Sequence, residues 1–549
     1  MLASTQRGVS GSGPSAYPSM NDHTHAPQPI IARLAQIVGA DRLLTAPEVL
    51  AAARHDVFFE GVAAPLAIVR PASTEAVQSL VKLALAEKLS LAPRGAGLSY
   101  SAGYVPADSR TVMVDLRGLD RILEIRAEDR YVVVEPGVTW EQLDEALQPL
   151  GLRTPFWGTF SGKHATVGGA LSQGAKFFGS GNRGSAAESV LALEVVVGDG
   201  SIVRTGSWGA SSSEATPFYR HYGPDLTGCF LGDCGAHGIK TRIALQLIPR
   251  PTVIRTASFA FGEADPMFRT MTSIGADLLA SECFAMDPFL VDLRMRFEGL
   301  QEDLESFRKV FSAQRSVLAG LRDAASLVLH GRRYASEVGF LMSVVTEGFT
   351  DQEAQWRMDQ ARAIAHRHGA RDLPDSLPKV VRASPFRRLN RLLGPEGERI
   401  VWFHAQVPNT MATRLYEDTE AVFSEHRDEV ERYGLRWGYL IGVNGPSTFG
   451  LEPIVYWRDA ALPVHREYIA PEHLARLPVH APNPEAREAV RRIRSAIIER
   501  WGELGATHLQ IGREYPFLST RTAGTAAALR ALKSSFDPQA IFNPGVLDT

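Results

Sequence analysis

The chain has 549 residues, 45% of them hydrophobic and 22% charged, and a formal net charge of −3 at neutral pH. This balance is typical of a globular protein of roughly two to four domains, and it excludes a basic field that would recruit nucleic acid or an anionic membrane. No apolar run is long enough to span a membrane, and the three cysteines are too few for a disulfide framework and fit no zinc spacing. We therefore expect buried thiols in a cytoplasmic protein.

Residues 1–30 are rich in Ser, Gly and Pro. They lack the basic and apolar regions of a secretory signal peptide, and we interpret them as a disordered tail.

Helix and strand patterns alternate over residues 31–251. Apolar residues at helical spacing predict helices over 31–39, 73–89 and 139–151, the last two with Ser73 or Thr74 and Thr139 as N-caps. Apolar and β-branched runs predict strands within 66–73, 90–93, 111–116, 130–137 and 239–251, and a hairpin over 191–206. Residues 117–129 are interpreted as a connection. The prolines at 249 and 251 mark a domain boundary.

Residues 252–505 have a different pattern, with longer helical stretches between strands. We predict helices over 307–329, 351–370 and 483–505, strands over 339–348, 398–408 and 435–445, and a loop over 388–399. This pattern is typical of an α+β domain in which helices cover an antiparallel sheet. Residues 506–549 end in a helix and a tail with several Pro and Gly residues.

Three glycine clusters follow apolar runs in the N-terminal part: "PRGAGLSYSAG" (93–103), "ATVGGALSQGA" (165–175) and "GCFLGDCGAHGI" (228–239). Backbone amides approach a phosphate or a flat ring only where no β-carbon intervenes, and successive amides form an anion-binding nest. One cluster alone is more simply a tight turn. Three clusters favour a single extended ligand that lies along all of them.

These motifs, with "VVVEPGVTWEQLDEAL", "VLALEVVVGDGSIVRTG" and "FDPQAIFNPG", resemble the vanillyl-alcohol oxidase and p-cresol methylhydroxylase family. The resemblance implies an α+β fold: a two-lobed FAD-binding domain over 31–251, completed by 506–549, and a substrate-binding cap domain over 252–505 with an antiparallel sheet. It places the FAD pyrophosphate on the amides of residues 94–99.

The cofactor contacts that the resemblance implies involve Pro93, Arg94, Gly95, Ala96, Gly97, Leu98, Ser99, Tyr100, Ser101, Pro136, Thr166, Gly168, Gly169, Ser172, Gly174, Glu188, Gly235, Gly238, Ile239, Arg513 and Asn543. Many members attach their flavin covalently through a His. No His occupies the glycine loop or the cap near Gly450, so we expect dissociable FAD, with His164 or His237 as the remaining candidates for attachment.

Arg513 occupies the position of an Arg that stabilises the anionic reduced flavin in the family. Tyr100 matches a Tyr that binds the substrate phenolate in phenol-oxidising members, where a second Tyr directly precedes the Arg. Here Gly512 precedes Arg513, although Tyr515 lies two residues beyond. The phenolate-binding pair is therefore incomplete, and packing of Tyr100 within the loop is the alternative interpretation.

The general base requires a pKa near the working pH and reach to the substrate. His404 alternates with Trp402 and Gln406 in "WFHAQ", and Glu452 lies among apolar residues that would raise the pKa of its carboxyl group. A satisfied buried histidine is the alternative for His404. The metal-binding motif of lactate- and glycolate-oxidising relatives is missing, so we expect no metal.

We predict an FAD-dependent oxidoreductase that takes a hydride from an alcohol or benzylic-type carbon of a small, possibly aromatic substrate, with O2 or another electron acceptor. A 2-hydroxy acid dehydrogenase of the D-lactate or glycolate type is the alternative. We expect no nucleic-acid partner, and a homo-oligomer is compatible with the sequence.

Overall fold

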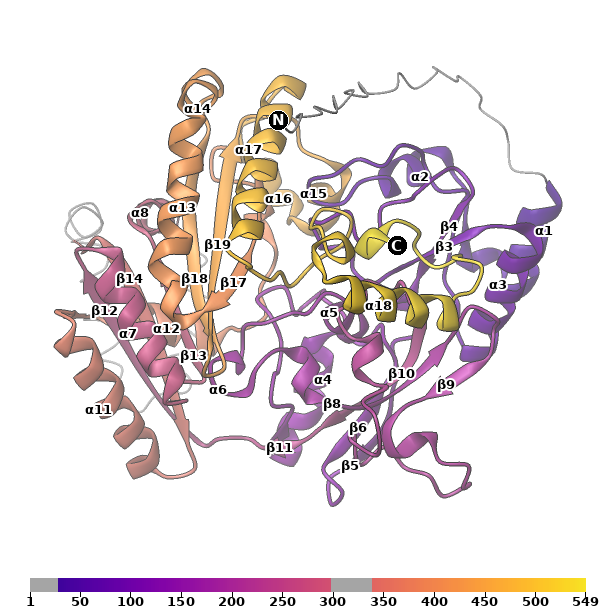
Figure 1. Ribbon diagram of the computed structural model, residues 1–549, viewed down its shortest axis with the longest axis horizontal. Helices are drawn as coiled ribbons and strands as arrows, with labels where there is room; N and C mark the ends of the chain where they lie inside the picture. The colour runs from indigo at the N-terminus through magenta and orange to yellow at the C-terminus, as the bar shows by residue number, and fades with distance from the viewer. Residues whose placement is uncertain (1–27, 298–337) are drawn as a thin grey trace, which may run out of the picture.

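The structure is a computed structural model that describes residues 28–297 and 338–549. The α+β class predicted from the sequence is confirmed (Figure 1). Residues 28–30, assigned to the tail, form the first turn of helix α1 (Gln28–Val38). The rest of the predicted tail and the predicted helix over 307–329 lie outside the described residues.

The first sheet has the strand order β1-β2-β4-β3, in which β2, β4 and β3 are parallel and β1 is antiparallel to β2. Helix α3 connects β2 to β3 and begins where the sequence predicts, because the Ser73 hydroxyl accepts a hydrogen bond from the Ala76 amide. The elements are β1 (Leu43–Leu44), α2 (Pro47–Ala53), β2 (Ala67–Val69), α3 (Thr74–Glu87), β3 (Ser90–Arg94) and β4 (Thr111–Asp115).

The second sheet is antiparallel, in the order β5-β6-β10-β8-β9, and contains the predicted hairpin as β8 and β9. Strand β5 lies within the segment interpreted as a connection. It is an edge strand whose side chains are half-buried or exposed, so it has no clear apolar face to identify it. The elements are β5 (Ile122–Arg126), β6 (Tyr131–Val134), α4 (Trp140–Leu147), β7 (Leu152–Arg153), α5 (Val167–Ser172), α6 (Ser180–Arg183), β8 (Val190–Val196), β9 (Ile202–Arg204), β10 (Ile239–Gln246) and β11 (Ile248–Pro249).

The third sheet is antiparallel and has eight strands, in the order β15-β12-β14-β13-β18-β19-β16, with β17 also paired to β19. The strand predicted over 398–408 is divided into β16 and β17 at Phe403 and His404. Pro453 of β19 accepts from the Phe403 amide but has no N–H to return a hydrogen bond, which interrupts the ladder there. The strands are β12 (Val253–Phe261), β13 (Glu282–Met286), β14 (Phe340–Gly348), β15 (Arg371–Leu373), β16 (Arg399–Trp402), β17 (Ala405–Pro408), β18 (Arg436–Asn444) and β19 (Thr448–Trp457).

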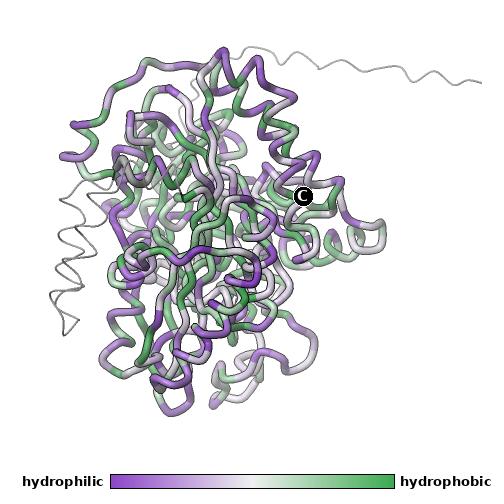
Figure 2. The backbone as a smooth tube through the Cα atoms, turned by 90° about the vertical axis from the view of Figure 1, so that its left-hand side faces the viewer, coloured by the Kyte–Doolittle hydropathy of each residue, from purple (hydrophilic) through white to green (hydrophobic). Residues whose placement is uncertain are grey.

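Helices flank this sheet, and the hydrophobic stretches of the chain concentrate in the interior (Figures 1 and 2). Predicted helices 351–370 and 483–505 are confirmed as α11 and α17. The helices are α7 (Ala264–Ala276), α8 (Pro288–Phe297), α11 (Asp351–Arg367), α12 (Ser376–Ala383), α13 (Ala412–Glu425), α14 (Arg427–Tyr433), α15 (Pro463–Tyr468), α16 (Pro471–Leu474) and α17 (Pro484–Glu503).

The C-terminal segment returns to the first two sheets, where α18 (Ala523–Phe536), yellow in Figure 1, lies beside the N-terminal part of the chain. Phe542 forms a parallel bridge with Leu91 of β3, and the Gly198 amide donates to the Phe536 carbonyl. The return brings residues after 506 to the end of β3, where the first glycine cluster begins.

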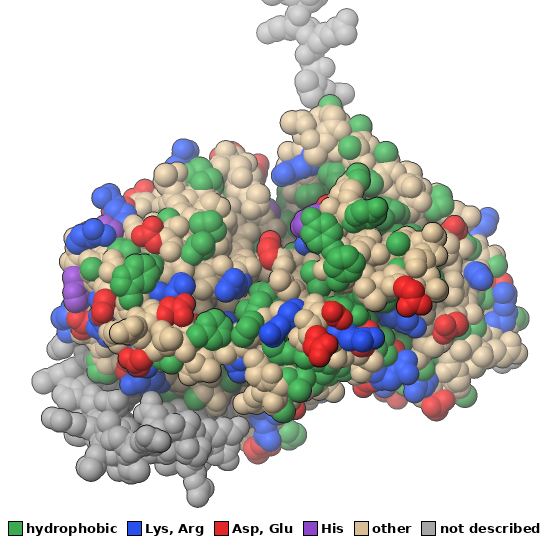
Figure 3. All heavy atoms as spheres, turned by 90° about the horizontal axis from the view of Figure 1, so that it is seen from below, with side chains coloured by type: hydrophobic (Ala, Val, Ile, Leu, Met, Phe, Trp, Pro, Cys, Tyr) green, Lys and Arg blue, Asp and Glu red, His purple; other side chains and the backbone are tan. Residues whose placement is uncertain are grey.

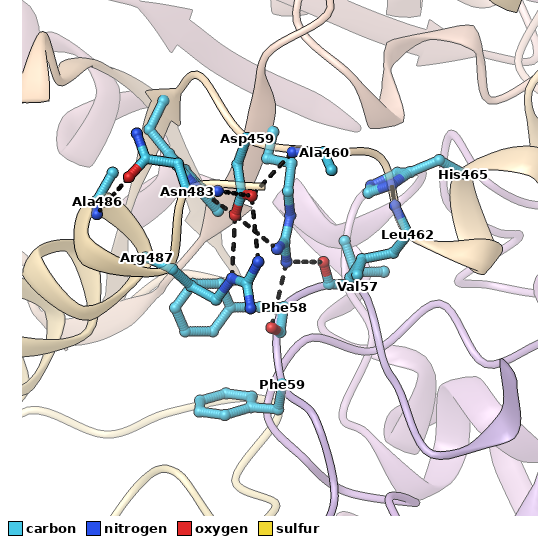
Figure 4. A network of polar contacts seen from close by, with 12 residues as sticks. Val57, Phe58, Phe59, Asp459, Ala460, Leu462, His465, Asn483, Ala486 and Arg487 are labelled. Atoms are coloured by element: carbon cyan, nitrogen blue, oxygen red, sulfur yellow. Dashed lines mark hydrogen bonds and ion pairs between the residues drawn. The ribbon is translucent and has the colours of Figure 1, made fainter. Parts of the chain in front are cut away.

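A buried ion-pair network joins the third sheet to residues 57–58 (Figure 4). Arg399 donates to Asp459 at 3.1 Å and to the carbonyls of Val57 and Phe58, and Arg487 donates twice to the same carboxylate. Arg399 and Asp459 are both fully buried. Each charge therefore depends on the other for compensation.

We expect Asp459→Ala to lower the free energy of unfolding by about 3–5 kcal/mol, because it leaves the buried Arg399 guanidinium uncompensated. Denaturant unfolding measures this change. Glu472→Ala is the matched control: it breaks an exposed pair with Arg388, so its effect is expected to stay below about 1 kcal/mol. Equal effects for the two variants would contradict the role given to the network.

Candidate active site

The segment after β3, residues 95–103, is called the glycine loop. Its carbonyl groups are held from outside by groups far away in the chain. Arg494 of α17 donates to the Tyr100 carbonyl at 3.0 Å, Asn543 donates to that of Gly103 at 2.5 Å, and Tyr468 donates to that of Ala96. These contacts fix the backbone of the loop from outside.

The amide groups of the glycine loop have the opposite property. Within the described part of the chain, no backbone N–H of residues 96–101 donates a hydrogen bond. Unpaired backbone donors are uncommon in folded proteins. A run of successive free amides forms an anion-binding nest, and this arrangement fits the pyrophosphate of FAD.

The three glycine clusters meet at this loop, as the sequence predicts. Gly95 lies against Thr166 and Gly235 against Pro93, each so close that an added β-carbon would be 2.4 Å from the neighbouring side chain. Thr166 also caps α5 by accepting from the Gly169 amide.

Further predicted cofactor residues adjoin these contacts. Gly168 packs on Pro136, Gly238 adjoins Val195 and Val196, and Gly174 adjoins Leu509. Ile239 pairs with Val196, and the Ser172 hydroxyl accepts from Lys240. These residues lie within or beside the second and third clusters, which contact the end of β3 and the glycine loop through Gly235 and Thr166.

Arg513 has a different role from the predicted flavin contact. Its guanidinium donates to the carbonyls of Ala102, Val105 and Pro544 and to the Asn543 side chain. These contacts use all five of its N–H groups. Arg513 therefore braces the glycine loop and has no N–H left for the flavin.

Glu188 is the one predicted cofactor residue that the described contacts do not connect to the loops. It is exposed, accepts from the Ser185 hydroxyl at 2.6 Å, and lines a cleft of about 570 Å³ between α6 and the β18–β19 turn. The family resemblance implied a contact with the cofactor, but Glu188 lines a different opening.

Three of the four predicted catalytic residues come together. Alternate residues of a strand share one face, so Gly450 and Glu452 of β19 face the same side, and Gln406 lies directly opposite Gly450. The Tyr100 hydroxyl donates to Glu452 Oε1 at 2.9 Å, and the Tyr100 ring lies 6.0 Å from that of His404. The glycine loop and one face of the third sheet thus form a single site.

Glu452 is half-buried at this site. Burial raises the pKa of its carboxyl group, while the Lys176 charge and the Tyr100 hydrogen bond act against that shift. Burial and the neighbouring carboxylate raise the pKa of the Tyr100 phenol well above its ordinary value. At neutral pH Tyr100 is therefore a hydrogen-bond donor, and Glu452 is the acceptor with the elevated proton affinity.

His404 is held by the C-terminal segment. The amides of Leu509 and Gln510 lie 3.3 Å and 3.2 Å from its two ring nitrogens, and its own amide donates to the Tyr515 hydroxyl at 3.0 Å. Burial lowers its pKa well below the ordinary value. The low pKa makes this buried imidazole a poor base. The Tyr515 ring stacks on the His404 ring, and its hydroxyl accepts from the His404 amide.

Lys176 was not identified from the sequence, although it is a single cation within "SQGAKFFG". It follows the second glycine cluster, is half-buried, and its ammonium group lies against Gly450. The nearby Gln406 was placed on this face by its alternation with His404, but without a role. Neither residue belongs to a recognisable sequence motif, because its place at the site is determined only by the folded structure.

The attachment candidates have other contacts. His237 Nδ1 lies 2.6 Å from the Cys229 carbonyl oxygen, and His164 packs against Tyr468. Dissociable FAD stays a prediction. The three cysteines are free thiols. Cys234 and Cys283 are buried as expected, whereas Cys229 is only half-buried.

In the described ranges, no three His, Cys, Asp or Glu side chains gather in a way that could hold a metal ion. None of the helices described is both long and apolar enough to cross a bilayer. On the face shown in Figure 3, acidic and basic side chains are interspersed.

Two family models match the chain: "FAD binding domain" over residues 65–206 and "FAD linked oxidases, C-terminal domain" over residues 250–547. The chain belongs to the FAD-linked oxidase family. The glycine loop with its free amides lies within the matched FAD-binding domain.

The curated relatives of this FAD-linked oxidase have different substrates. It is 28% identical over 210 residues to glycolate oxidase subunit GlcD of Bacillus subtilis, covering 38% of this chain and 43% of that protein. It is 30% identical over 205 residues to the flavoprotein subunit of 4-cresol dehydrogenase [hydroxylating] of Pseudomonas putida, covering 37% and 39%. The chain therefore spans less than half the length of these relatives.

The fold extends over nearly the whole chain. The structure of p-cresol methylhydroxylase with substrate bound aligns over 95% of this chain and 96% of its own, with a TM-score of 0.70 and 17% sequence identity. At this identity the match shows the fold and not the substrate.

Proposed function

We propose that this FAD-linked oxidase oxidises a small alcohol, or a carbon with a similarly activated C–H bond, with Glu452 as the general base. The observation that carries the proposal is the hydrogen bond from Tyr100 to a half-buried carboxylate of raised pKa beside the glycine loop. Bound FAD supplies the hydride acceptor. Dissociable FAD, held by the three glycine clusters, is part of the proposal.

Glu452 is suited to receive the hydroxyl proton of the substrate. Its Oε1 is held by Tyr100, while Oε2 accepts no hydrogen bond from the described residues. Its raised pKa brings its proton affinity closer to that of a base that works near neutral pH. His404 serves as a positioning residue that holds residues 509–510 beside the site.

A 2-hydroxy acid is the second substrate candidate, alongside an alcohol with an aromatic ring. The matched glycolate oxidase subunit supports this candidate, as does the Tyr100 hydroxyl, which already donates to Glu452 and so is not free for a phenolate. The electron acceptor, O2 or another oxidant, belongs to the same proposal.

The purified protein is expected to be yellow, and its flavin absorbance is expected to bleach when a substrate alcohol or 2-hydroxy acid is added without oxygen. Recovery of colour in air identifies an oxidase, and its absence identifies a dehydrogenase. A protein that stays colourless after incubation with FAD would contradict the proposal. A yellow protein that no member of either substrate class reduces would remove the substrate assignment.

A further inference from the structure

Lys176 lies in the segment between α5 and α6 with its charge close to the proposed base. Its ammonium group makes no hydrogen bond, and no ion pair within 4 Å, with any described residue. Burial lowers the pKa of Lys176, and the Glu452 charge raises it. A half-buried cation without a direct partner is unusual, because removing a charge from water is unfavourable unless it is paired.

The ammonium group lies on the sheet itself. A β-carbon built on Gly450 would be 2.2 Å from Lys176 Nζ. Nζ therefore occupies the place where a side chain of β19 would stand, on the same face as Glu452 two residues further along. Glycine at this position lets the cation approach the sheet surface.

The side-chain amide of Gln406 is a second hydrogen-bond donor without a partner on this face of the sheet. Gln406 of β17 lies directly opposite Gly450, so its side chain shares this face of the sheet. Its Nε2 atom is buried and has no hydrogen-bond partner in the described part of the chain. Leaving such a donor unpaired is unfavourable. An ammonium and an amide N–H2 that lack acceptors at neighbouring positions require an acceptor, and the ammonium favours a negatively charged one.

We propose that Lys176 and Gln406 bind a carboxylate of the substrate, so that the reacting carbon lies towards Glu452. The inference rests on the proposed function and narrows its substrate class to an organic acid. The site differs from a phenolate site, because the Tyr100 hydroxyl that would hold a phenolate already donates to Glu452.

The test measures binding of anions to the FAD-loaded protein. Benzoate and acetate are titrated against their neutral analogues, benzamide and acetamide, and the change in flavin absorbance reports binding. Wild type is expected to bind at least one acid about 10–100-fold more tightly than its amide, the range for a charge-assisted hydrogen bond. Lys176→Met is expected to abolish this preference.

Gly450→Ala keeps the charge but places a β-carbon where the ammonium lies, so it is expected to weaken acid binding as well. Lys163→Met is the matched control, because it removes an exposed lysine of the same charge and is expected to leave the preference unchanged. If Lys176→Met does not retain FAD, the acid preference of Gly450→Ala is compared with that of wild type, and a weaker preference in Gly450→Ala supports the inference.

Three results would overturn the inference: no spectral change with either acid in wild type, equal affinity for acid and amide, or a preference that survives in both variants. A lower flavin midpoint potential in unliganded Lys176→Met with unchanged acid binding would instead assign Lys176 to the flavin. A yellow enzyme that neutral alcohols reduce but acids do not perturb contradicts this inference alone. A protein that takes up no FAD contradicts the proposed function.

Discussion

Gly512→Ala is expected to lower FAD affinity by at least tenfold and to destabilise the protein by about 2–5 kcal/mol. Gly512 has a φ of +57°, and an added β-carbon would be 2.0 Å from the carbonyl oxygen of Ser101. A left-handed conformation costs a residue with a β-carbon about 1–2 kcal/mol, and overpacking costs about 1–3 kcal/mol. The displaced atom belongs to the glycine loop, so the free amides move with it.

Gly502→Ala is the matched control for this effect. Gly502 lies within α17, where an added β-carbon meets nothing within 4 Å. Alanine in a helix interior is more favourable than glycine by about 1 kcal/mol, so this variant is expected to be neutral or slightly stabilised. FAD titration by fluorescence and denaturant unfolding measure both effects. Unchanged FAD affinity in Gly512→Ala would show that the return segment does not shape the loop.

Glu452→Gln is expected to slow flavin reduction by substrate about 10²–10⁴-fold while FAD stays bound. The amide keeps an oxygen for the Tyr100 hydroxyl but cannot take the proton of the substrate. Stopped-flow measurement of anaerobic flavin bleaching gives the rate. A reduction rate within a few-fold of wild type would remove Glu452 from the role of base.

The rate of flavin reduction is expected to increase with pH. A base acts only when ionised, so the rate in wild type rises as the pH increases through the pKa of Glu452, which lies above the ordinary 4.5. Tyr100→Phe removes a hydrogen bond that lowers this pKa, so the rising limb is expected to move to higher pH. In Glu452→Gln the rate is expected to show no such rise with pH, because the titrating carboxylate is absent.

Local patterns predicted much of the fold. The helices and strands predicted within the described residues appear where periodicity placed them, because packing follows the same patterns. Strands β12, β13 and β19 and helices α7 and α13 were not predicted. Strand β5 was missed because an edge strand buries little. The strand over 398–408 was predicted unbroken because its interruption depends on Pro453 of a partner strand distant in sequence.

Some residues of the candidate site could be predicted from the sequence, and others could not. The glycine clusters and Tyr100 could be identified because a loop that approaches a phosphate restricts its own residues. The sequence could not identify Lys176, Arg494 or the role of Arg513. Each of them depends on which hydrogen-bonding groups from distant parts of the chain lie beside it in the folded protein. Arg513 was expected to face the flavin, and counting its acceptors required the folded chain.

The outside contacts of the glycine loop also determine when the protein can be loaded with its cofactor. Asn543, which holds Gly103, is separated from it by 440 residues, and Arg494 and Arg513 follow the loop residues that they hold by 394 and 411 residues. During synthesis the loop therefore emerges long before the groups that shape it. The nascent chain has the residues for a phosphate nest but not its geometry, so cofactor uptake becomes a late step of maturation that only a nearly finished chain can complete.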